Sequence, residues 1–253
     1  MKVLITGHEG FIGRNALRIL SDSFDVIPYE GDIREFKISE YYGAVLHLAA
    51  LAGVRKSWLD PVEYWDVNVK GSMQVFSECQ RLNLRCVYAS SSSIYEWWQN
   101  PYATSKKAME EIAPPYSVGM RFHTVYGPDS RPDMFYDMML NNKVEYLTDH
   151  KRDWTHVEDV VSAIKIILTD TRIQGTLDIG TGNPVSVVDV AREFGYRDVP
   201  IREVTGERIV THADNSQLRN LGWTPEYNIM EEVKNERIKR AVFMVREVSS
   251  SQT

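Results

Sequence analysis

Residues 3–13 have the sequence Val-Leu-Ile-Thr-Gly-His-Glu-Gly-Phe-Ile-Gly, with glycines at positions 7, 10 and 13. The apolar residues at its start predict a strand that is buried on both faces, as in a parallel sheet. Residues 11–20 then carry apolar side chains at helical spacing, so the glycines lie in a turn between a strand and a helix. Glycine lets main-chain N–H groups approach a phosphate at the positive end of a helix dipole. The stretch therefore predicts a dinucleotide-binding turn in an α/β fold.

The same alternation of short strands and longer helices continues along the chain. Apolar runs predict strands at residues 25–29, 44–48, 85–89, 118–122 and 175–179. Helical spacing predicts helices at residues 11–20, 61–82, 102–113 and 157–168, and more weakly at 187–194, 214–221 and 229–248. This order is typical of a Rossmann-type doubly wound parallel sheet with a small, shortened C-terminal substrate lobe. The predicted division is a dinucleotide domain (1–122 and 153–182), a lobe (123–152 and 183–248) and a disordered tail (249–253).

Composition limits the classes of partner. The chain has 253 residues, of which 43% are hydrophobic and 25% charged, which is enough for a folded core. The net charge of -6 provides no basic field, so we expect no nucleic-acid partner. Two cysteines, Cys79 and Cys86, are too few for a disulfide framework and predict a reducing, cytoplasmic location. We expect no signal peptide, no membrane span and no metal site.

Charged residues follow the second predicted strand. Glu30 lies 17 residues past the last glycine of the turn, about where a carboxylate binds the adenosine ribose in dinucleotide folds. This acid favours NAD over NADP, because it repels the additional phosphate. Arg14 and Arg34 are cations that could receive that phosphate, so NADP stays as the less favoured alternative. Asp32 and Ile33 are candidates for holding the adenine amino group, and the alternative for all these charges is a solvated loop.

A serine run and a tyrosine–lysine pair lie near the carboxyl end of the fourth predicted strand. Residues 90–93 are all serine, and the sequence from residue 102 is Tyr-Ala-Thr-Ser-Lys. Tyr102 and Lys106 are four residues apart, so they share one face of a helix. A nearby cation favours the phenolate and would lower the pKa of Tyr102 toward neutrality. Ligands bind at this end of open α/β sheets, so the pair predicts a catalytic cleft.

Together these motifs resemble the extended short-chain dehydrogenase/reductases of the NAD-dependent epimerase/dehydratase family, from residue 1 to about residue 225. Further matching segments are His-Leu-Ala-Ala at 47–50, Asn-Val-Lys-Gly at 68–71, Val-Tyr-Gly-Pro at 125–128, Arg-Asp-Trp-Thr-His-Val at 152–157 and Leu-Gly-Trp-Thr-Pro at 221–225. The resemblance implies that Tyr102 is the catalytic base, that Lys106 holds the nicotinamide ribose, and that Ser91 is the catalytic hydroxyl. It implies NAD as cofactor, bound by Gly7, Gly10, Phe11, Ile12, Gly13, Glu30, Asp32, Ile33, Leu48, Ala49, Ala50, Asn68, Tyr102 and Lys106.

Two segments are similar to the UDP-glucuronate 4-epimerases of this family. They are Ala-Gly-Val-Arg-Lys-Ser at 52–57 and Thr-Val-Tyr-Gly-Pro-Asp-Ser-Arg-Pro-Asp-Met at 124–134. The resemblance implies that Thr124 and Arg131 lie beside a sugar carboxylate and that Arg152 holds a substrate diphosphate. Substrate contacts are also expected from Arg55, Ser92 and Ser93. The strand end lacks the acidic residues of the dehydratases, so we expect C4 epimerisation of a nucleotide sugar.

Three alternatives stay open at this point. The same scaffold supports nucleotide-sugar reductases and decarboxylases, for which His123 is the one candidate for a second acid, unless it is a core histidine. The short loop after Tyr95 and the short lobe also allow an NAD-binding scaffold without turnover. Trp97 and Trp98 in that loop either cover the nicotinamide, stack on a base or form a hydrophobic plug. Relatives often dimerise through the helices that match residues 61–82 and 102–113, which allows a homodimer here.

Overall fold

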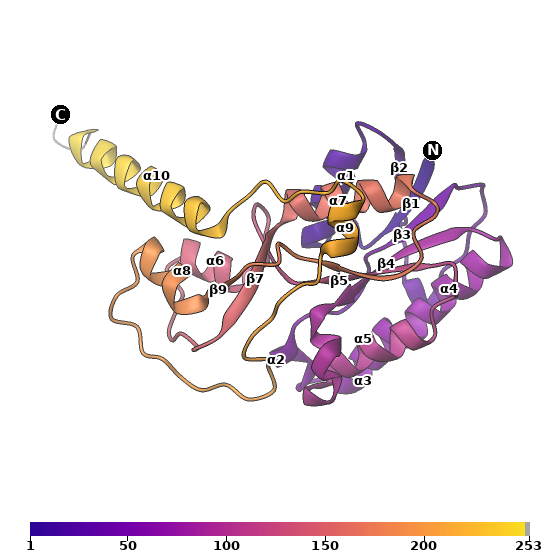
Figure 1. Ribbon diagram of the computed structural model, residues 1–253, viewed down its shortest axis with the longest axis horizontal. Coiled ribbons are helices and arrows are strands. Elements are labelled where there is room, and N and C mark those ends of the chain that lie inside the picture. Colours follow the sequence, from indigo (N-terminus) through magenta and orange to yellow (C-terminus); the bar gives the residue numbers. More distant parts are fainter. Residues whose placement is uncertain (251–253) are drawn as a thin grey trace.

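The computed structural model describes residues 1–250 and is built on a six-stranded parallel sheet (Figure 1). Its strand order is β2-β1-β3-β4-β5-β8, and every pairing is parallel. The strands are β1 (Lys2–Thr6), β2 (Asp25–Pro28), β3 (Ala44–His47), β4 (Arg85–Ser91), β5 (Val118–Phe122) and β8 (Gly175–Ile179). All six strands predicted from apolar runs are confirmed, with ends that differ by at most two residues.

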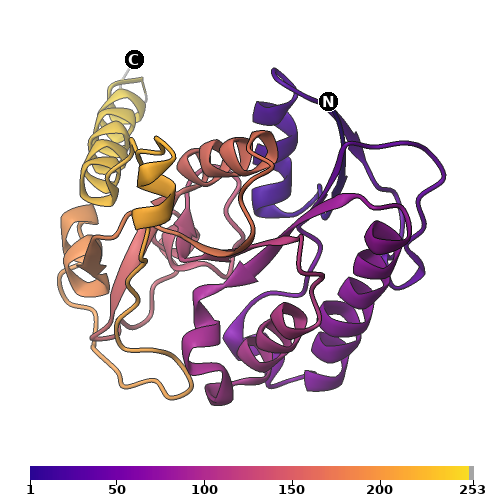
Figure 2. The same cartoon turned by 45° about the vertical axis from the view of Figure 1, so that its right-hand side comes forward.

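Helices cover both faces of this sheet, as expected for a doubly wound fold (Figure 2). One face packs against α1 (Phe11–Leu20) and α7 (Val157–Thr169), through a core that includes Val3 and Ile5. Leu4 belongs instead to the core on the opposite face, because successive side chains of a strand point to opposite sides. That second face is covered by α3 (Pro61–Trp65), α4 (Ser72–Arg81) and α5 (Pro101–Glu111).

The predicted helix at residues 61–82 is interrupted by a π-helical segment at Asp66–Gly71, labelled η2, between α3 and α4. Asn68 lies within this segment and is fully buried. Its side chain accepts a hydrogen bond from the Leu51 amide (2.8 Å) and donates to the Leu51 carbonyl (3.0 Å) and to Ser105 Oγ (2.9 Å). The widened turn thus places an amide where it holds the loop that follows β3, and π segments are often found at such functional positions.

A smaller unit lies beside the carboxyl end of the large sheet. Its three-stranded sheet has the order β6-β7-β9, formed by β6 (Thr124–Tyr126), β7 (Lys151–His156) and β9 (Pro184–Ser186). A separate core that includes Tyr126, Met139 and Trp154 joins this sheet to α6 (Phe135–Leu140), α8 (Val187–Phe194) and α10 (Ile229–Ser250). Strand β7 runs across the predicted domain boundary at residues 152 and 153, so that boundary divides one strand.

The remaining elements correct two predictions. The helix expected at residues 214–221 is shorter, with α9 at Ser216–Asn220. Helix α10 continues to Ser250, so the prediction of a disordered tail is wrong for residues 249 and 250. Residues 251–253, the rest of that predicted tail, lie outside the described part of the chain. Short helices complete the fold: η1 (Ile33–Glu35), α2 (Val54–Ser57) and η3 (Ser92–Gln99). In the described chain, η1 is the only helix between β2 and β3. Strand β2 lies at one edge of the sheet.

Candidate active site

The glycine turn between β1 and α1 is packed backbone against backbone. Gly7 has a φ of +71°, and a Cβ atom there would lie 2.5 Å from the amide nitrogen of Ala49. At Gly13 a Cβ atom would lie 2.0 Å from the carbonyl oxygen of Gly7. In the described chain no side chain caps α1 at Gly10, so the first amides of that helix stay available. Such a cradle with an open helix N-terminus fits a dinucleotide pyrophosphate.

The charged loop after β2 is only partly arranged as the sequence predicts. Glu30 keeps an exposed carboxylate, 3.4 Å from Nε2 of His8. Asp32 is already engaged, because Arg34 donates to its carboxylate from the main chain (2.8 Å) and from the guanidinium (2.9 Å). These hydrogen bonds hold the pKa of Asp32 below its usual value. The side chain of Ile33 is buried in the core, so only its main chain is left for the predicted contact with adenine, and that contact stays a prediction.

The other predicted cofactor residues line the ends of β1 and β3. Leu48, Ala49 and Ala50 directly follow β3 and are partly buried, and the Ala49 amide donates to Thr6 Oγ1 (3.3 Å). Phe11 is buried in the core and Ile12 packs on it, so both shape the turn from beneath. The Asn68 side chain is fully committed to Leu51 and Ser105, so it positions the loop after β3.

Lys106 is fully buried on α5 and contacts the strand beneath it. Its Nζ donates a hydrogen bond of 2.8 Å to the carbonyl oxygen of Ala89 on β4. Burial lowers the pKa of Lys106 to about 7, although Glu110 nearby acts in the opposite direction. A lysine in this state titrates near neutral pH, which is unusual for an ammonium group.

Tyr102 lies in the first turn of α5, whose N-cap is Asn100, and Ser91 ends β4 beside it. The prediction that the pKa of Tyr102 lies below its ordinary value is wrong. Burial raises this pKa, and a hydrogen bond with the Ser91 hydroxyl and the positive charge of Arg131 oppose the rise without reversing it. Lys106 is not among the groups that shift this pKa, and its ammonium group donates to the Ala89 carbonyl.

A cleft of about 730 Å³ separates this edge of the large sheet from the smaller unit. Ser91 lines it, and so does each of the six predicted substrate residues, Arg55, Ser92, Ser93, Thr124, Arg131 and Arg152. They come from four separate parts of the chain, so the tertiary structure brings the predicted set together. Lys56, Asn100, Glu207 and Arg208 also line the cleft, and none of them was assigned a role from the sequence.

Arg131 is held by one edge of its guanidinium group. Its Nε donates to Oδ1 of Asp133 (3.1 Å), and Nζ of Lys56 lies 3.1 Å from Oδ2 of the same carboxylate. Among the described residues, the two Nη groups of Arg131 have no hydrogen-bond partner. Two parallel N–H groups of this kind form a fork that matches the geometry of a carboxylate.

Arg152 is placed differently, since its guanidinium is largely buried. It donates to the carbonyl oxygen of Arg208 (2.6 Å), to Nδ1 of His150 (2.6 Å) and to Glu207 (3.1 Å). Burial lowers its pKa, while Glu207 acts in the opposite direction. The other oxygen of Glu207 lies 3.9 Å from Nε of Arg55, so one acid holds two predicted substrate cations.

Comparison with known proteins identifies the family. A sequence model of the NAD dependent epimerase/dehydratase family matches residues 3–180. The chain belongs to this family. It is 28% identical to UDP-glucuronate 4-epimerase 4 of Arabidopsis thaliana, over 92% of this chain and 73% of that protein. It is 31% identical to Protein CapI of Staphylococcus aureus, over 65% of this chain and 68% of that protein.

Two solved structures share the fold over most of this chain. MoeE5 in complex with UDP-glucuronic acid and NAD aligns with a TM-score of 0.81 at 29% identity, covering 95% of this chain and 100% of that chain. The UDP-glucose 4-epimerase of Thermus thermophilus in complex with NAD aligns with a TM-score of 0.78 at 23% identity, covering 94% of this chain and 98% of that chain. At the lower identity the likeness shows the fold alone.

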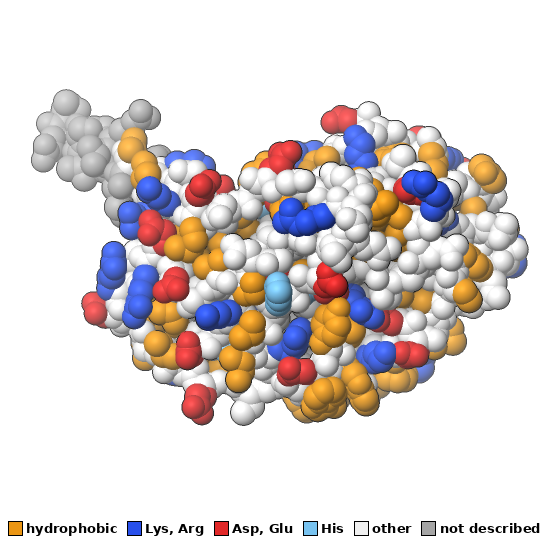
Figure 3. Space-filling model, viewed as in Figure 1, with side chains coloured by type: hydrophobic (Ala, Val, Ile, Leu, Met, Phe, Trp, Pro, Cys, Tyr) orange, Lys and Arg blue, Asp and Glu red, His pale blue; other side chains and the backbone are white. Residues whose placement is uncertain are grey.

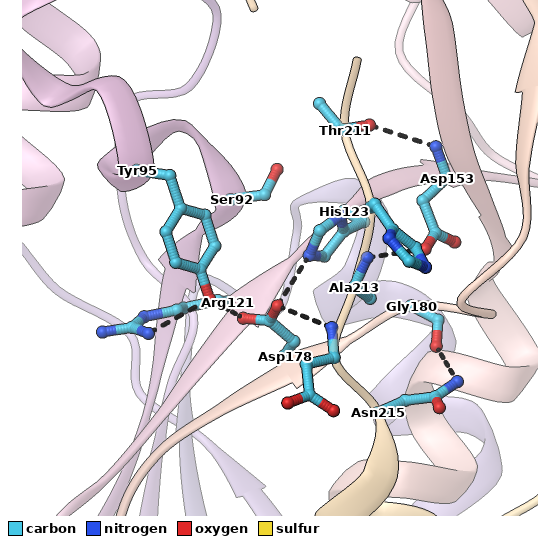
Figure 4. Close-up of polar contacts among 12 residues, drawn as sticks. Ser92, Tyr95, Arg121, His123, Asp153, Asp178, Gly180, Thr211, Ala213 and Asn215 are labelled. Atoms are coloured by element: carbon cyan, nitrogen blue, oxygen red, sulfur yellow. Dashed lines mark hydrogen bonds and ion pairs between the residues drawn. The ribbon is translucent and has the colours of Figure 1, made fainter.

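Within this epimerase/dehydratase fold, His123 lies in a buried polar network (Figure 4). Its Nε2 is 3.3 Å from Oδ2 of Asp178, and Tyr95 donates to the other oxygen of Asp178 (2.7 Å). Burial raises the pKa of Asp178, but the contacts with His123 and Tyr95 outweigh it and leave that pKa low. His123 is among the residues that line the cleft, but its side chain is 0% exposed, which favours the interpretation as a core histidine over that as a second acid.

The two tryptophans of the short loop are exposed and do not line the cleft. Trp97 and Trp98 are 43% and 65% exposed, and their rings meet edge to face at 6.1 Å. Neither side chain is among the described residues that line the cleft. A hydrophobic plug needs buried rings, so that interpretation is wrong for both residues, and contact with a nicotinamide or a base has no support in this arrangement.

Proposed function

We propose that the chain is an NAD-dependent nucleotide-sugar 4-epimerase, which acts on UDP-glucuronate or a related UDP-sugar by transient oxidation at C4 and return of the hydride. The placement of Arg131 carries this proposal. Its charge acts on Tyr102, and two of its N–H groups are free in a cleft lined by Ser91 and Thr124. A protein 29% identical over most of this chain was solved with UDP-glucuronic acid and NAD, which supports the same substrate class.

The residues of the glycine turn fit NAD. The close approach of Gly7, Gly13 and Ala49 leaves main-chain amides at the start of α1 for the pyrophosphate, and the exposed Glu30 suits the adenosine ribose hydroxyls. Arg34 is tied to Asp32 and lies 3.3 Å from Glu63, so it is poorly placed to receive the additional phosphate of NADP. When bound, NAD accepts a hydride from the sugar and returns it.

Tyr102 and Ser91 supply the proton chemistry in this proposal. Ser91 bonds to the tyrosine hydroxyl, so both groups can bind one sugar oxygen. The phenolate form of Tyr102 takes the proton of this oxygen as the carbonyl forms, and the resulting phenol gives that proton back when the hydride returns. Burial raises the pKa of Tyr102, and each nearby positive charge counteracts that rise. The charge of Arg131 therefore assists the proton chemistry of Tyr102, in addition to its role toward the substrate.

A carboxylate on the substrate gives Arg131 a second task. A uronic acid oxidised at C4 is a β-keto acid, which loses carbon dioxide readily when its carboxylate is free to turn. A forked, charged hydrogen bond from Arg131 would hold that carboxylate in one plane, with Thr124 lining the same cleft. This restraint favours return of the hydride over decarboxylation, which is what an epimerase requires.

A decarboxylase, a reductase or a scaffold without turnover are the competing outcomes. His123, the candidate second acid, has no exposed side-chain surface, and Ser92 and Ser93 stand where the dehydratases carry acids. The deciding experiment incubates purified protein with UDP-glucuronate and follows the nucleotide sugars by NMR. We expect interconversion with UDP-galacturonate without net consumption of NAD(P)H or release of carbon dioxide.

Tyr102→Phe should lower this turnover by a factor of about 10³ while NAD stays bound, since the general acid–base contribution is lost. Tyr41→Phe is the matched control, because Tyr41 is 84% exposed and is not among the described residues that line the cleft. Absence of turnover with UDP-, GDP- and dTDP-sugars would refute the epimerase proposal. Binding of NAD without any turnover would favour the scaffold.

We also propose a homodimer, a cytoplasmic location and a division into a dinucleotide domain and a substrate lobe, with the boundary placed after β7 at His156 because β7 belongs to the smaller sheet. Large apolar side chains are exposed on and near α3 and α4, including Val62, Trp65 and Met73. Orange side chains gather at the lower edge of the molecule in Figure 3, the region occupied by α3 in Figure 1.

No helix in the described residues combines the length and apolar character needed to cross a membrane.

A further inference from the structure

Residues 202–210 cross the cleft as a strap. Its two ends are attached to the smaller unit by main-chain hydrogen bonds, from Arg202 to the Leu147 carbonyl (2.8 Å) and from Lys151 to the Ile209 carbonyl (2.9 Å). On the other side of the cleft it reaches η3, the short helix that follows β4 of the large sheet, where Nε of Arg208 lies 3.5 Å from Oε1 of Glu96. The strap thus contacts both sides of the cleft that the proposed function assigns to the substrate.

Asn100 connects this strap to the catalytic helix. Its Oδ1 accepts a hydrogen bond from the Ala103 amide (2.8 Å) and so caps α5, while its Nδ2 donates to the Gly206 carbonyl (2.9 Å). The side chain is buried, with 4% of the residue exposed. Gly206 has a φ of +81°, which favours glycine, and a Cβ atom there would lie 3.4 Å from the Gln99 carbonyl oxygen, at van der Waals contact. A carboxamide is suited to this position, since it offers a donor and an acceptor on one planar group.

The residue after Gly206 contacts the cations of the cleft. Glu207 lies 3.1 Å from Arg152, the residue expected to hold the substrate diphosphate, and 3.9 Å from Arg55, another predicted substrate cation. A bound diphosphate competes with Glu207 for these guanidinium groups, because both are anions at the same donors. Binding there must therefore change the contacts of the strap beside Gly206. Glu207 loses a cation, whereas Arg208, which also lines the cleft, gains the ligand, so the strap becomes attached to the bound diphosphate.

We infer that Asn100 is a positioning residue, which couples diphosphate binding at the strap to the first turn of α5 and so to Tyr102. The inference rests on the proposed function for the identity of the ligand. Tyr102 lies two residues beyond Asn100, in the turn that Asn100 caps. Ordering of the strap by a ligand thereby orders the catalytic tyrosine through one side chain. Such coupling is reciprocal, so a change at the helix also alters binding at the strap.

The test measures amide hydrogen exchange with UDP as the probe, without a sugar. In the wild-type protein we expect UDP to slow exchange both in the strap and at residues 103–106. Asn100→Asp keeps an oxygen that caps α5, but it loses the donor to Gly206 and places a second acceptor against that carbonyl. In this variant UDP should slow exchange in the strap alone, and the kcat for the sugar substrate should fall about tenfold.

A control on the same turn separates coupling from helix stability. Thr104 Oγ1 donates to the carbonyl oxygens of Trp97 and Asn100 and does not contact the strap, so Thr104→Val should keep the UDP effect on residues 103–106. If Asn100→Asp keeps that effect too, the inference is overturned. It is also overturned if UDP protects the strap but not the helix in the wild type. If UDP does not bind at all, the nucleotide-sugar proposal fails, and this inference fails with it.

Discussion

The glycine turn and the substrate cleft lie at the same edge of the sheet but are held by different kinds of contact. In the turn, main-chain atoms meet main-chain atoms, and added Cβ atoms at Gly7 or Gly13 would lie within 2.5 Å of a neighbour. In the cleft, cations meet acids, as Arg131 and Lys56 meet Asp133 and Arg152 meets Glu207. The turn therefore tolerates no additional atom, whereas the charges of the cleft can exchange one anion for another.

The largest effect is expected in the turn. Gly13→Ala should remove NAD binding and lower the free energy of unfolding by about 3 kcal/mol, because the new methyl group overlaps the Gly7 carbonyl. Gly222→Ala is the control, since Gly222 has a φ of +87° but no neighbouring atom within 4 Å. It should cost only about 1 kcal/mol and leave NAD binding unchanged. Urea denaturation measures the stability of each variant, and titration with NAD measures its affinity. Normal NAD affinity in Gly13→Ala would contradict the proposed difference between the turn and the cleft.

The next effect is expected at Arg131 in the cleft. Arg131→Lys keeps the charge but loses the forked pair of N–H groups, so preference for UDP-glucuronate over UDP-glucose should fall tenfold to a hundredfold, about 1.5–3 kcal/mol. Lys56→Gln removes the other partner of Asp133, which is an exposed pair, and should change that preference by less than about 1 kcal/mol. The ratio of kcat/KM for the two sugars measures this preference. An unchanged ratio in Arg131→Lys would refute the proposal that Arg131 binds the sugar carboxylate.

A third effect concerns the pH dependence of Lys106. Its pKa of about 7 in the folded protein lies below the ordinary 10.5, so the unfolded chain binds more protons between these values. Stability from this group therefore rises with pH across that interval, as the cost of burying the ammonium disappears. Lys106→Met should be more stable relative to wild type at pH 7 than at pH 9, by about 2 kcal/mol. Urea denaturation at the two pH values measures the difference, and a constant difference would exclude a buried ammonium.

The smallest effect is expected outside both regions, at Trp98. Because its side chain is 65% exposed, Trp98→Ala should change the free energy of unfolding by less than about 0.5 kcal/mol and leave the KM for the sugar unaltered. Trp223→Ala is the comparison, since Trp223 is 2% exposed and its Nε1 donates to Asp159 and Ser162. That change should cost about 3–5 kcal/mol. A large rise in KM for Trp98→Ala would show that this ring reaches the ligand after all.

Most of the fold follows from patterns within a few residues. Apolar runs predict all six strands of the large sheet, and the spacing of Tyr102 and Lys106 places them on one helix. The π segment at 66–71 was not predictable in this way, because it depends on a contact between Asn68 and Leu51, 17 residues apart in the chain. The strap was missed for the same reason, since Asn100 and Gly206 are separated by 106 residues.

The sequence by itself determined the parallel sheet, the glycine turn at 7–13 and the family to which the chain belongs, because short-range spacing sets all three. It also predicted three of the cations that line the cleft, Arg55, Arg131 and Arg152, but not Lys56 or Arg208. Only the tertiary structure decided that the pKa of Tyr102 is raised and that Glu207 holds Arg55 and Arg152. The physical reason is that burial and charge pairing depend on which distant segments meet, and no local pattern records that.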